Sequence, residues 1–348
     1  MTRTLAVRLD SLGDVLVTGS AVRALAASSD HLALLCGPRG RSAAELLPGV
    51  DDVHCWRAPW IDPEPDPVHR EDVEDLVARI AAGAYDRAVV FTSFHQSALP
   101  TALLLRMAGV SWVGAISEDY PGSLLDLRHR CEDDQPEPER ALGLARACGA
   151  ELPDGDDGRL AVRAEVLDGP VPARPYVLLH PGTSVPARAW PAERFRETCR
   201  LLAAAGHRVV VTGAPDETDL TAYVAGDHGI DRGAGTSLAE LARTLAGADA
   251  VVVGNTGPAH LAAAVGAPVV SLFAPTVPAA RWAPYGVPSV LLGDQHAPCR
   301  GSRATTCPVS GHPCLASVTP EDVVAAVLAL VDDARGADRD TITLRRIS

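Results

Sequence analysis

The sequence contains no lysine, since all 31 of its basic residues are arginine. It is also poor in aromatic side chains, which make up 4% of its 348 residues. It has no run of about 18 uninterrupted apolar residues, which excludes a membrane-spanning helix. The first residues carry charges every few positions instead of the apolar stretch of a signal peptide. We therefore expect a cytoplasmic protein with no integral membrane segment.

Acidic residues outnumber basic ones by 44 to 31, which gives a net charge of −13. Such a field repels phosphate backbones and anionic headgroups, so nucleic acid is excluded as a general partner. With 47% hydrophobic residues the chain is neither disordered nor fibrous, and its length suits two domains.

Short β-rich runs alternate with amphipathic helical stretches along the whole chain, a rhythm that demands parallel sheets covered by helices. The predicted strands are residues 4–9, 31–35, 87–92, 160–162, 176–180, 208–212, 250–253 and 268–273, and the predicted helices include a stretch after residue 9 and residues 191–205, 258–265 and 320–333. A Pro-rich acidic loop at 62–75 should run into a helix near Asp72.

Gly, Pro and acidic residues concentrate between 151 and 175, as they do in linkers. We place the domain boundary near residue 170, which gives domains at 1–170 and 171–335 and a charged, flexible tail at 336–348. The predicted fold class is α/β, with two doubly wound, Rossmann-like domains that face each other across a cleft. Ligands of such domains bind at the carboxyl ends of the strands.

The loop after the first predicted strand, RLDSLGD, ends in Gly13 and Asp14. It lacks the G-x-G-x-x-G of a dinucleotide site. Asp14 either caps the following helix, or acts as a general base that removes the proton of an attacking hydroxyl.

Two loops of the second half suit an anion. In HPGTS, followed by Arg188, the hydroxyls of Thr183 and Ser184 and a planar guanidinium match phosphate oxygens, although a solvated loop remains the alternative. In GNTGPAH, Asn255, Thr256 and Gly257 lead into a helix whose N-terminus favours negative charge. His260 is either a donor there or a packed histidine.

Four segments in order resemble glycosyltransferase family 9, the lipopolysaccharide heptosyltransferase-like enzymes. They are RLDSLGDVLVTGSAVRAL (8–25), LLHPGTSVPARAWPAERF (178–195), VVVTGAPDE (209–217) and GNTGPAHLAAAVGAPVVSLFAPTVPAARWAP (254–284). The resemblance covers residues 3–333. It implies a GT-B fold with an acceptor domain followed by a nucleotide-sugar domain, and inverting transfer of a sugar, heptose from ADP-heptose, without a metal or other cofactor.

The resemblance also implies roles for single residues. Asp14 matches the catalytic aspartate, and the donor-binding positions are Thr183, Ser184, Arg188, Glu217, Asn255, Thr256, Gly257 and His260. Glu217 would contact the nucleoside. Arg188 stands where the family has lysine, and it keeps the charge. Asn255 stands where the family often has aspartate, so a carboxylate against the donor is missing.

The acceptor is expected to be a saccharide or a glycosylated small molecule or lipid, bound by loops of the first domain at 94–97 and 117–130. The candidate acceptor residues are Gly13, His95, Arg128 and His129. Two rival functions remain: a non-catalytic nucleotide-sugar-binding protein, suggested by Asn255, and a GT-B-like nucleotide-sugar epimerase.

A cysteine-rich loop contains Cys299, Cys307 and Cys314, with His296 and His312 nearby. Its spacings lack the C-x-x-C pairs of common zinc sites. We expect reduced, packed thiols, with a structural zinc as the alternative.

Overall fold

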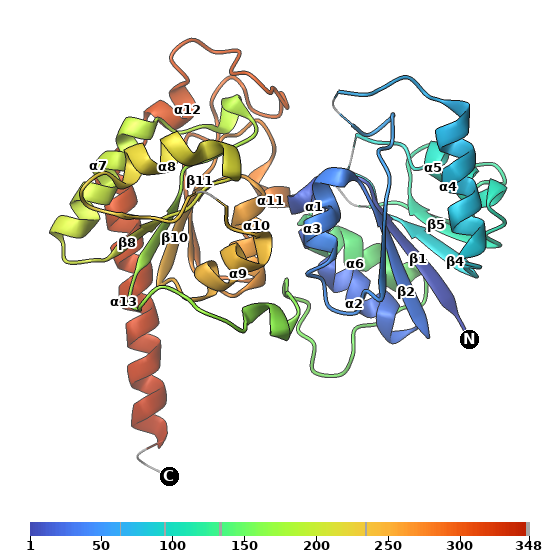
Figure 1. Ribbon diagram of the computed structural model, residues 1–348, viewed down its shortest axis with the longest axis horizontal. Coiled ribbons are helices and arrows are strands. Elements are labelled where there is room, and N and C mark those ends of the chain that lie inside the picture. Colours follow the sequence, from blue (N-terminus) through green and yellow to red (C-terminus); the bar gives the residue numbers. More distant parts are fainter. Residues whose placement is uncertain (63, 94, 132–133, 234, 346–348) are drawn as a thin grey trace. The chain divides into compact units, whose positions relative to one another are not determined.

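A computed structural model of the chain describes residues 1–62, 64–93, 95–131, 134–233 and 235–345. The chain divides into two compact units, Met1–Arg163 and Ala164–Ser348. Each contains one six-stranded sheet, and in each sheet every pair of neighbouring strands is parallel. Both units are coloured by sequence in Figure 1.

The sheet of the first unit has the strand order β3-β2-β1-β4-β5-β6. Its strands are β1 (Arg3–Arg8), β2 (His31–Cys36), β3 (Asp52–Cys55), β4 (Arg87–Val90), β5 (Trp112–Ile116) and β6 (Leu127–His129). The central strand β1 is buried on both faces, as expected for a parallel sheet between helices. The order reverses beside β1, so β1 and β4 flank the point where ligands of such sheets bind.

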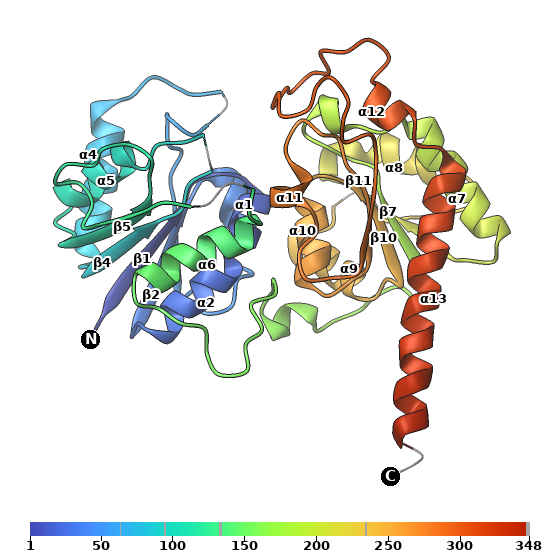
Figure 2. The same ribbon diagram turned by 180° about the vertical axis from the view of Figure 1, so that it is seen from behind.

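Helices cover both faces of this sheet. They are α1 (Leu12–Val17), α2 (Gly19–Ala27), η1 (Pro38–Gly40), α3 (Arg41–Ala44), α4 (Arg70–Ala82), α5 (Leu99–Met107) and α6 (Glu137–Ala147). Figures 1 and 2 show α2 beside α6 on one face and α4 beside α5 on the other. The single helix expected after residue 9 is instead two, and the Thr18 hydroxyl donates to the carbonyl of Asp14 (2.8 Å) where they meet, a bond that often bends helices.

The sheet of the second unit has the order β12-β11-β10-β7-β8-β9. Its strands are β7 (Val177–His180), β8 (Val209–Val211), β9 (Ile230–Asp231), β10 (Ala250–Gly254), β11 (Val269–Leu272) and β12 (Ser289–Leu292). The two central strands, β7 and β10, are entirely buried. With the first sheet, this confirms the predicted class of two doubly wound α/β domains.

The helical elements of the second unit are η2 (Ala164–Leu167), η3 (Pro186–Arg188), α7 (Ala192–Ala204), η4 (Pro215–Glu217), α8 (Thr218–Ala225), α9 (Leu238–Ala246), α10 (Gly257–Ala264), α11 (Ala279–Trp282), α12 (Pro313–Ala316) and α13 (Pro320–Arg345). Phe195 of α7 and Val323 and Val327 of α13 share a core with Val177 and Val252 of the sheet. Figure 2 shows the length of α13.

The end of the chain differs from the expected tail. We expected the last helix to stop at Asp333, but α13 continues to Arg345, so residues 336–345 are helical. A single glycine such as Gly336 costs a helix only about 1 kcal/mol and need not end it. Among the described residues, no helix has both the length and the apolar character needed to cross a bilayer.

The linker also differs from its prediction. Residues 160–162 form no strand. Instead Leu160 and Val162 are buried, and Arg163 donates to the carbonyls of Leu47 and Val50. This segment packs on a loop of the first unit rather than on a sheet, which is why the division falls at Arg163–Ala164, before the expected boundary near residue 170.

Candidate active site

Asp14 lies in the first turn of α1, at the carboxyl end of β1, and each of its oxygens has a separate set of partners. Oδ2 accepts from the Ser11 hydroxyl (2.6 Å) and from the Ser11 backbone N–H (3.2 Å). Oδ1 accepts from Nη2 of Arg8 (3.0 Å) and from the Ser93 hydroxyl (3.4 Å). Asp14 can therefore stabilise the start of α1 and still present a carboxylate at the edge of the sheet where ligands bind.

The surroundings of Asp14 keep its carboxylate charged. Burial alone would raise its pKa, but the Arg8 guanidinium and the Ser11 hydrogen bonds outweigh burial and hold the pKa of Asp14 below its usual value. The side chain retains 16% exposure. An ionised carboxylate that a small hydroxyl compound can reach is what a general base requires.

Sequence reasoning missed the residues that hold Asp14 in place. Arg8 is 1% exposed and also pairs with Asp10 through Nε (2.8 Å). On its other side lies Glu137 of α6, whose Oε2 is 3.9 Å from Nη1 of Arg8. The available signal was an arginine directly after the apolar residues 5–7 of the strand, because a buried arginine needs carboxylate partners.

The acceptor candidates lie on three different segments of the first unit. Gly13 is buried beside it in α1, and His95 is an exposed residue of the loop after β4, the strand next to β1. Arg128 and His129 lie on the edge strand β6, where Arg128 donates to the carbonyl of Asp119 (3.1 Å). Burial and the nearby Arg140 lower the pKa of His129. Phe94, in the expected acceptor loop, lies outside the described residues.

The HPGTS loop follows β7, a central strand of the second sheet. Burial lowers the pKa of His180 to about 4, so this histidine is neutral, and its Nδ1 lies 3.1 Å from the Thr212 hydroxyl. The Thr183 hydroxyl accepts from the Val185 N–H (3.1 Å), which shapes the turn, and Ser184 is exposed. His180 supports the loop, while Ser184 is accessible to a ligand.

Arg188 and Asn255 connect this loop to its neighbour after β10. Nη1 of Arg188 donates to the Asn255 carbonyl (3.2 Å). The Asn255 amide donates to the Ala274 carbonyl (3.2 Å) and accepts from the Ala274 N–H (3.3 Å), so it ties the β10 loop to the chain after β11. An aspartate has no N–H for the first of these bonds.

We expect Asn255→Asp to lower the free energy of unfolding by about 1–3 kcal/mol near neutral pH, because a buried carbonyl loses its donor and faces a charge. Denaturant unfolding checks this. The loss should shrink as pH falls, because a protonated aspartate again donates a proton. Equal stability of variant and wild type from pH 5 to 8 would show that the hydrogen bonds between Asn255 and Ala274 do not stabilise the protein.

Glu217 ends η4, after β8, and its carboxylate lies against the HPGTS loop. A methyl group on Gly182 would come within 1.9 Å of Glu217 Oε2, so the glycine is what admits this side chain. Oε2 also accepts from the Ala214 N–H (2.8 Å). Two segments far apart in the sequence, Gly182 and Glu217, are thus brought together at one edge of the sheet.

The helix α10 begins where β10 ends. Thr256 is its N-cap residue and Gly257 its first residue, and both are partly exposed. Such a helix start offers backbone N–H groups and about half a positive charge to an anion. His260, one turn further, is nearly buried, with its ring 6.2 Å from that of Trp282.

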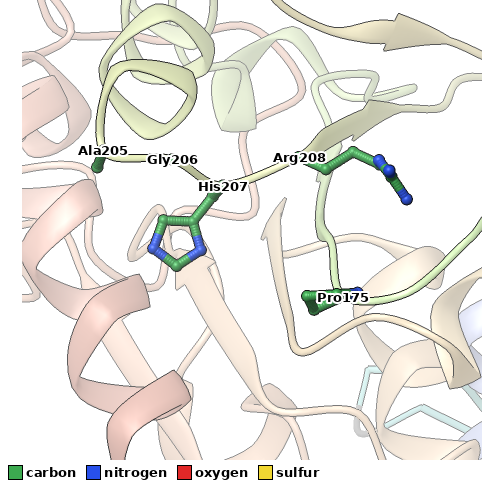
Figure 3. A pocket seen from close by; sticks show the side chains of 5 residues that line it. All are labelled: Pro175, Ala205, Gly206, His207 and Arg208. Atoms are coloured by element: carbon green, nitrogen blue, oxygen red, sulfur yellow. The ribbon is translucent and has the colours of Figure 1, made fainter.

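Two hollows lie in the second unit. One of about 480 Å³ follows β9, and its lining includes Arg232, Thr236 and Glu240; sequence reasoning missed it, although a Gly-rich turn after a strand was the signal. The other, of about 380 Å³, is lined by Pro175, Ala205, Gly206, His207 and Arg208 (Figure 3). It adjoins the amino ends of β7 and β8, at the opposite edge from the candidate residues.

In the part of the chain that the structure describes, no three His, Cys, Asp or Glu side chains are placed to hold a metal ion, and this includes the cysteine-rich loop. Cys299 and Cys314 are buried, and burial together with the adjacent Cys299 raises the pKa of Cys314 to about 11. The ring of His312 bonds the Ala187 carbonyl (3.0 Å). These side chains pack the loop onto the unit.

Comparison with known proteins decides the family. The model of glycosyltransferase family 9 (heptosyltransferase) matches residues 73–311, more than half of the chain. The chain belongs to glycosyltransferase family 9. The predicted membership of the family is thereby confirmed, and three of the four segments, at 178–195, 209–217 and 254–284, lie within the matched residues. This family 9 protein is a glycosyltransferase.

Its relatives include lipopolysaccharide heptosyltransferase 1 of Salmonella typhimurium, 29% identical in an alignment of 293 residues that covers 79% of this chain and 89% of the relative. The Pseudomonas aeruginosa protein of the same name is 33% identical in an alignment of 224 residues that covers 61% of each chain. Among solved structures, E. coli ADP-heptose lipopolysaccharide heptosyltransferase II superposes with a TM-score of 0.72 at 20% identity, over 96% of this chain and 100% of that one.

A second E. coli heptosyltransferase, solved with ADP-2-deoxy-2-fluoro heptose, gives a TM-score of 0.70 at 22% identity and covers 92% of this chain and 98% of that one. These likenesses show that the family 9 chain has the fold of the heptosyltransferases.

Proposed function

We propose that the protein is an inverting, metal-independent glycosyltransferase that moves heptose from ADP-heptose to a hydroxyl of a saccharide or glycosylated acceptor. The observation that carries the proposal is the bond from Arg188 to the Asn255 carbonyl, which joins two anion-suited loops on adjacent strands. The names of the relatives support the choice of donor.

The order of the strands suggests how the donor would lie. The diphosphate would occupy the loops after β7 and β10, between Ser184, Arg188 and the start of α10. Glu217, after the next strand, β8, would hold the ribose hydroxyls, which suits its place beside Gly182. The hollow after β9, the strand beyond, would receive the base.

Asp14 and the donor-binding loops would have separate tasks in the transfer. Asp14 would take the proton of the acceptor hydroxyl as its oxygen attacks the anomeric carbon, which forms the new C–O bond and breaks the bond to the diphosphate. Arg188 and the N-terminus of α10 would stabilise the negative charge that grows on the leaving group. His95, Arg128 and His129 remain candidates for the acceptor.

A non-catalytic binding protein was the alternative suggested by Asn255. The amide of that residue is engaged with Ala274, so its presence reflects how the loop is held. Membership of a transferase family favours the enzyme over both rivals.

The first experiment is a thermal-shift panel with ADP-, GDP-, UDP- and dTDP-sugars and their bare diphosphates. We expect the adenosine series alone to raise Tm, because a ligand at 100 times its Kd stabilises the folded state by about 2.7 kcal/mol. Stabilisation by another series would name a different donor. No shift in any series, with folded protein, would contradict the donor site.

A transfer assay with the donor so identified tests the rest of the proposal. NMR of the glycoside formed should show the anomeric configuration opposite to that of the donor. The rate should be the same after treatment with EDTA. Donor isomerised in the absence of acceptor would instead reveal the epimerase.

A further inference from the structure

Asp10 and Asp14 share one buried guanidinium. Arg8 is 1% exposed, and its Nε lies 2.8 Å from Asp10 Oδ2 while its Nη2 lies 3.0 Å from Asp14 Oδ1. Asp10 itself is nearly buried, 8% exposed. The positive charge of Arg8 therefore offsets only part of the cost of burying each carboxylate.

The other groups that face this pair come from α6 and from the loop after β4. Glu137 Oε2 lies 3.9 Å from Nη1 of Arg8 and 3.3 Å from Nη1 of Arg140. Gln96 donates through Nε2 to Asp10 Oδ1. Three carboxylates thus face two guanidiniums, so the cluster carries one negative charge when all are ionised and none when one carboxylate is protonated.

The two aspartates differ in how readily they take that proton. Burial, only partly offset by Arg8, and the charge of Asp14 raise the pKa of Asp10 to about 6, whereas the pKa of Asp14 is lowered. Carboxylates whose surroundings separate their pKa values in this way have separate tasks in many enzymes. Below about pH 6 the cluster therefore takes up its proton on Asp10, while Asp14 stays ionised.

We propose that Asp10 is a positioning residue that sets the basicity of Asp14 by competing with it for the guanidinium of Arg8. The inference rests on the proposed role of Asp14 as the base. When Asp10 is protonated, the charge of Arg8 interacts mainly with Asp14 and lowers the affinity of Asp14 for a proton. With Asp10 ionised, the guanidinium is shared and Asp14 accepts a proton more readily.

The test is the pH profile of kcat/KM for transfer. In the wild type we expect a rise of about three- to ten-fold centred near pH 6, because a general base becomes more effective as its basicity grows. Asp10→Asn should lack this rise and stay near the low-pH level. Gln96→Leu should move the rise to higher pH, because ionised Asp10 loses a donor.

A second measurement does not depend on activity. Because the folded protein holds a proton on Asp10 that the unfolded chain releases at lower pH, Asp10 lowers stability as pH rises from about 4 through 6. The Tm of Asp10→Asn, minus that of the wild type, should therefore increase between pH 4 and 7. The exposed Asp75 on α4 supplies the control, since Asp75→Asn should give a flat difference.

The outcomes separate the two proposals. A rise near pH 6 that persists in Asp10→Asn overturns the coupling, and so does a flat Tm difference for that variant. If Asp14→Asn keeps full activity, the proposed role of Asp14 as the base fails, while the Tm comparison still reports on Asp10. A profile that loses its rise only when Asp10 is changed supports the inference.

Discussion

Asp14→Asn will reduce kcat for sugar transfer about 100- to 10,000-fold, the usual contribution of a general base. Asparagine has the same shape and still accepts from Ser11, so the start of α1 should survive the change. What is lost is the ability to accept the acceptor's proton, together with the hydrogen bond from Nη2 of Arg8, because the amide nitrogen cannot accept it. The measurement is the initial rate with saturating donor, beside a thermal melt that shows the variant to be folded.

The matched control is Asp75→Asn, which makes the same chemical change on the exposed face of α4. Its kcat should equal that of the wild type. Donor affinity of Asp14→Asn should also be unchanged, because Asp14 belongs to the first unit and the donor loops to the second. Full transfer activity in a folded Asp14→Asn protein would remove the base from the mechanism.

Arg188→Met will raise the donor KM about 10- to 100-fold, which matches the roughly 1.5–3 kcal/mol of a hydrogen bond to a charged group. It should lower kcat as well, because the charge of the departing diphosphate grows during bond cleavage. Steady-state kinetics over a range of donor concentrations separates the two effects.

Arg188→Lys keeps the charge but loses the planar fork, so its KM should fall between those of the methionine variant and the wild type. The control is Arg200→Met on α7, a half-exposed arginine paired with Glu197. A donor KM unaltered in Arg188→Met would place the diphosphate elsewhere.

The fold was predictable because buried parallel strands leave a strong trace in sequence. Runs such as 177–179 and 250–253 consist only of Val, Leu and Ala, and a Gly-containing loop follows each of them closely. The rule that ligands gather at the carboxyl ends of such strands then pointed to Asp14 and Arg188. Candidate site residues that lie on one loop can be predicted in this way.

Contacts between distant segments were not predictable. The partners of Arg8 come from the loop after β1, the loop after β4 and the start of α6, and no spacing rule relates these segments. The place of Glu217 against Gly182 likewise depends on how two strands align. The strand expected at 160–162 failed for a related reason, since the next residue, Arg163, bonds the Leu47 and Val50 carbonyls of a loop in the first unit.

The charged cluster around Arg8 implies a trade-off between the stability of the first unit and catalysis. Buried ion pairs are often less stabilising than apolar side chains of similar volume, so replacing the whole cluster, Arg8, Asp10, Asp14, Glu137 and Arg140, by a packed apolar set would be neutral or favourable for the first unit. A laboratory evolution experiment that selects only for heat resistance should therefore accumulate substitutions here and yield robust, inactive proteins. Selection for thermostable catalysts would have to include turnover in every round.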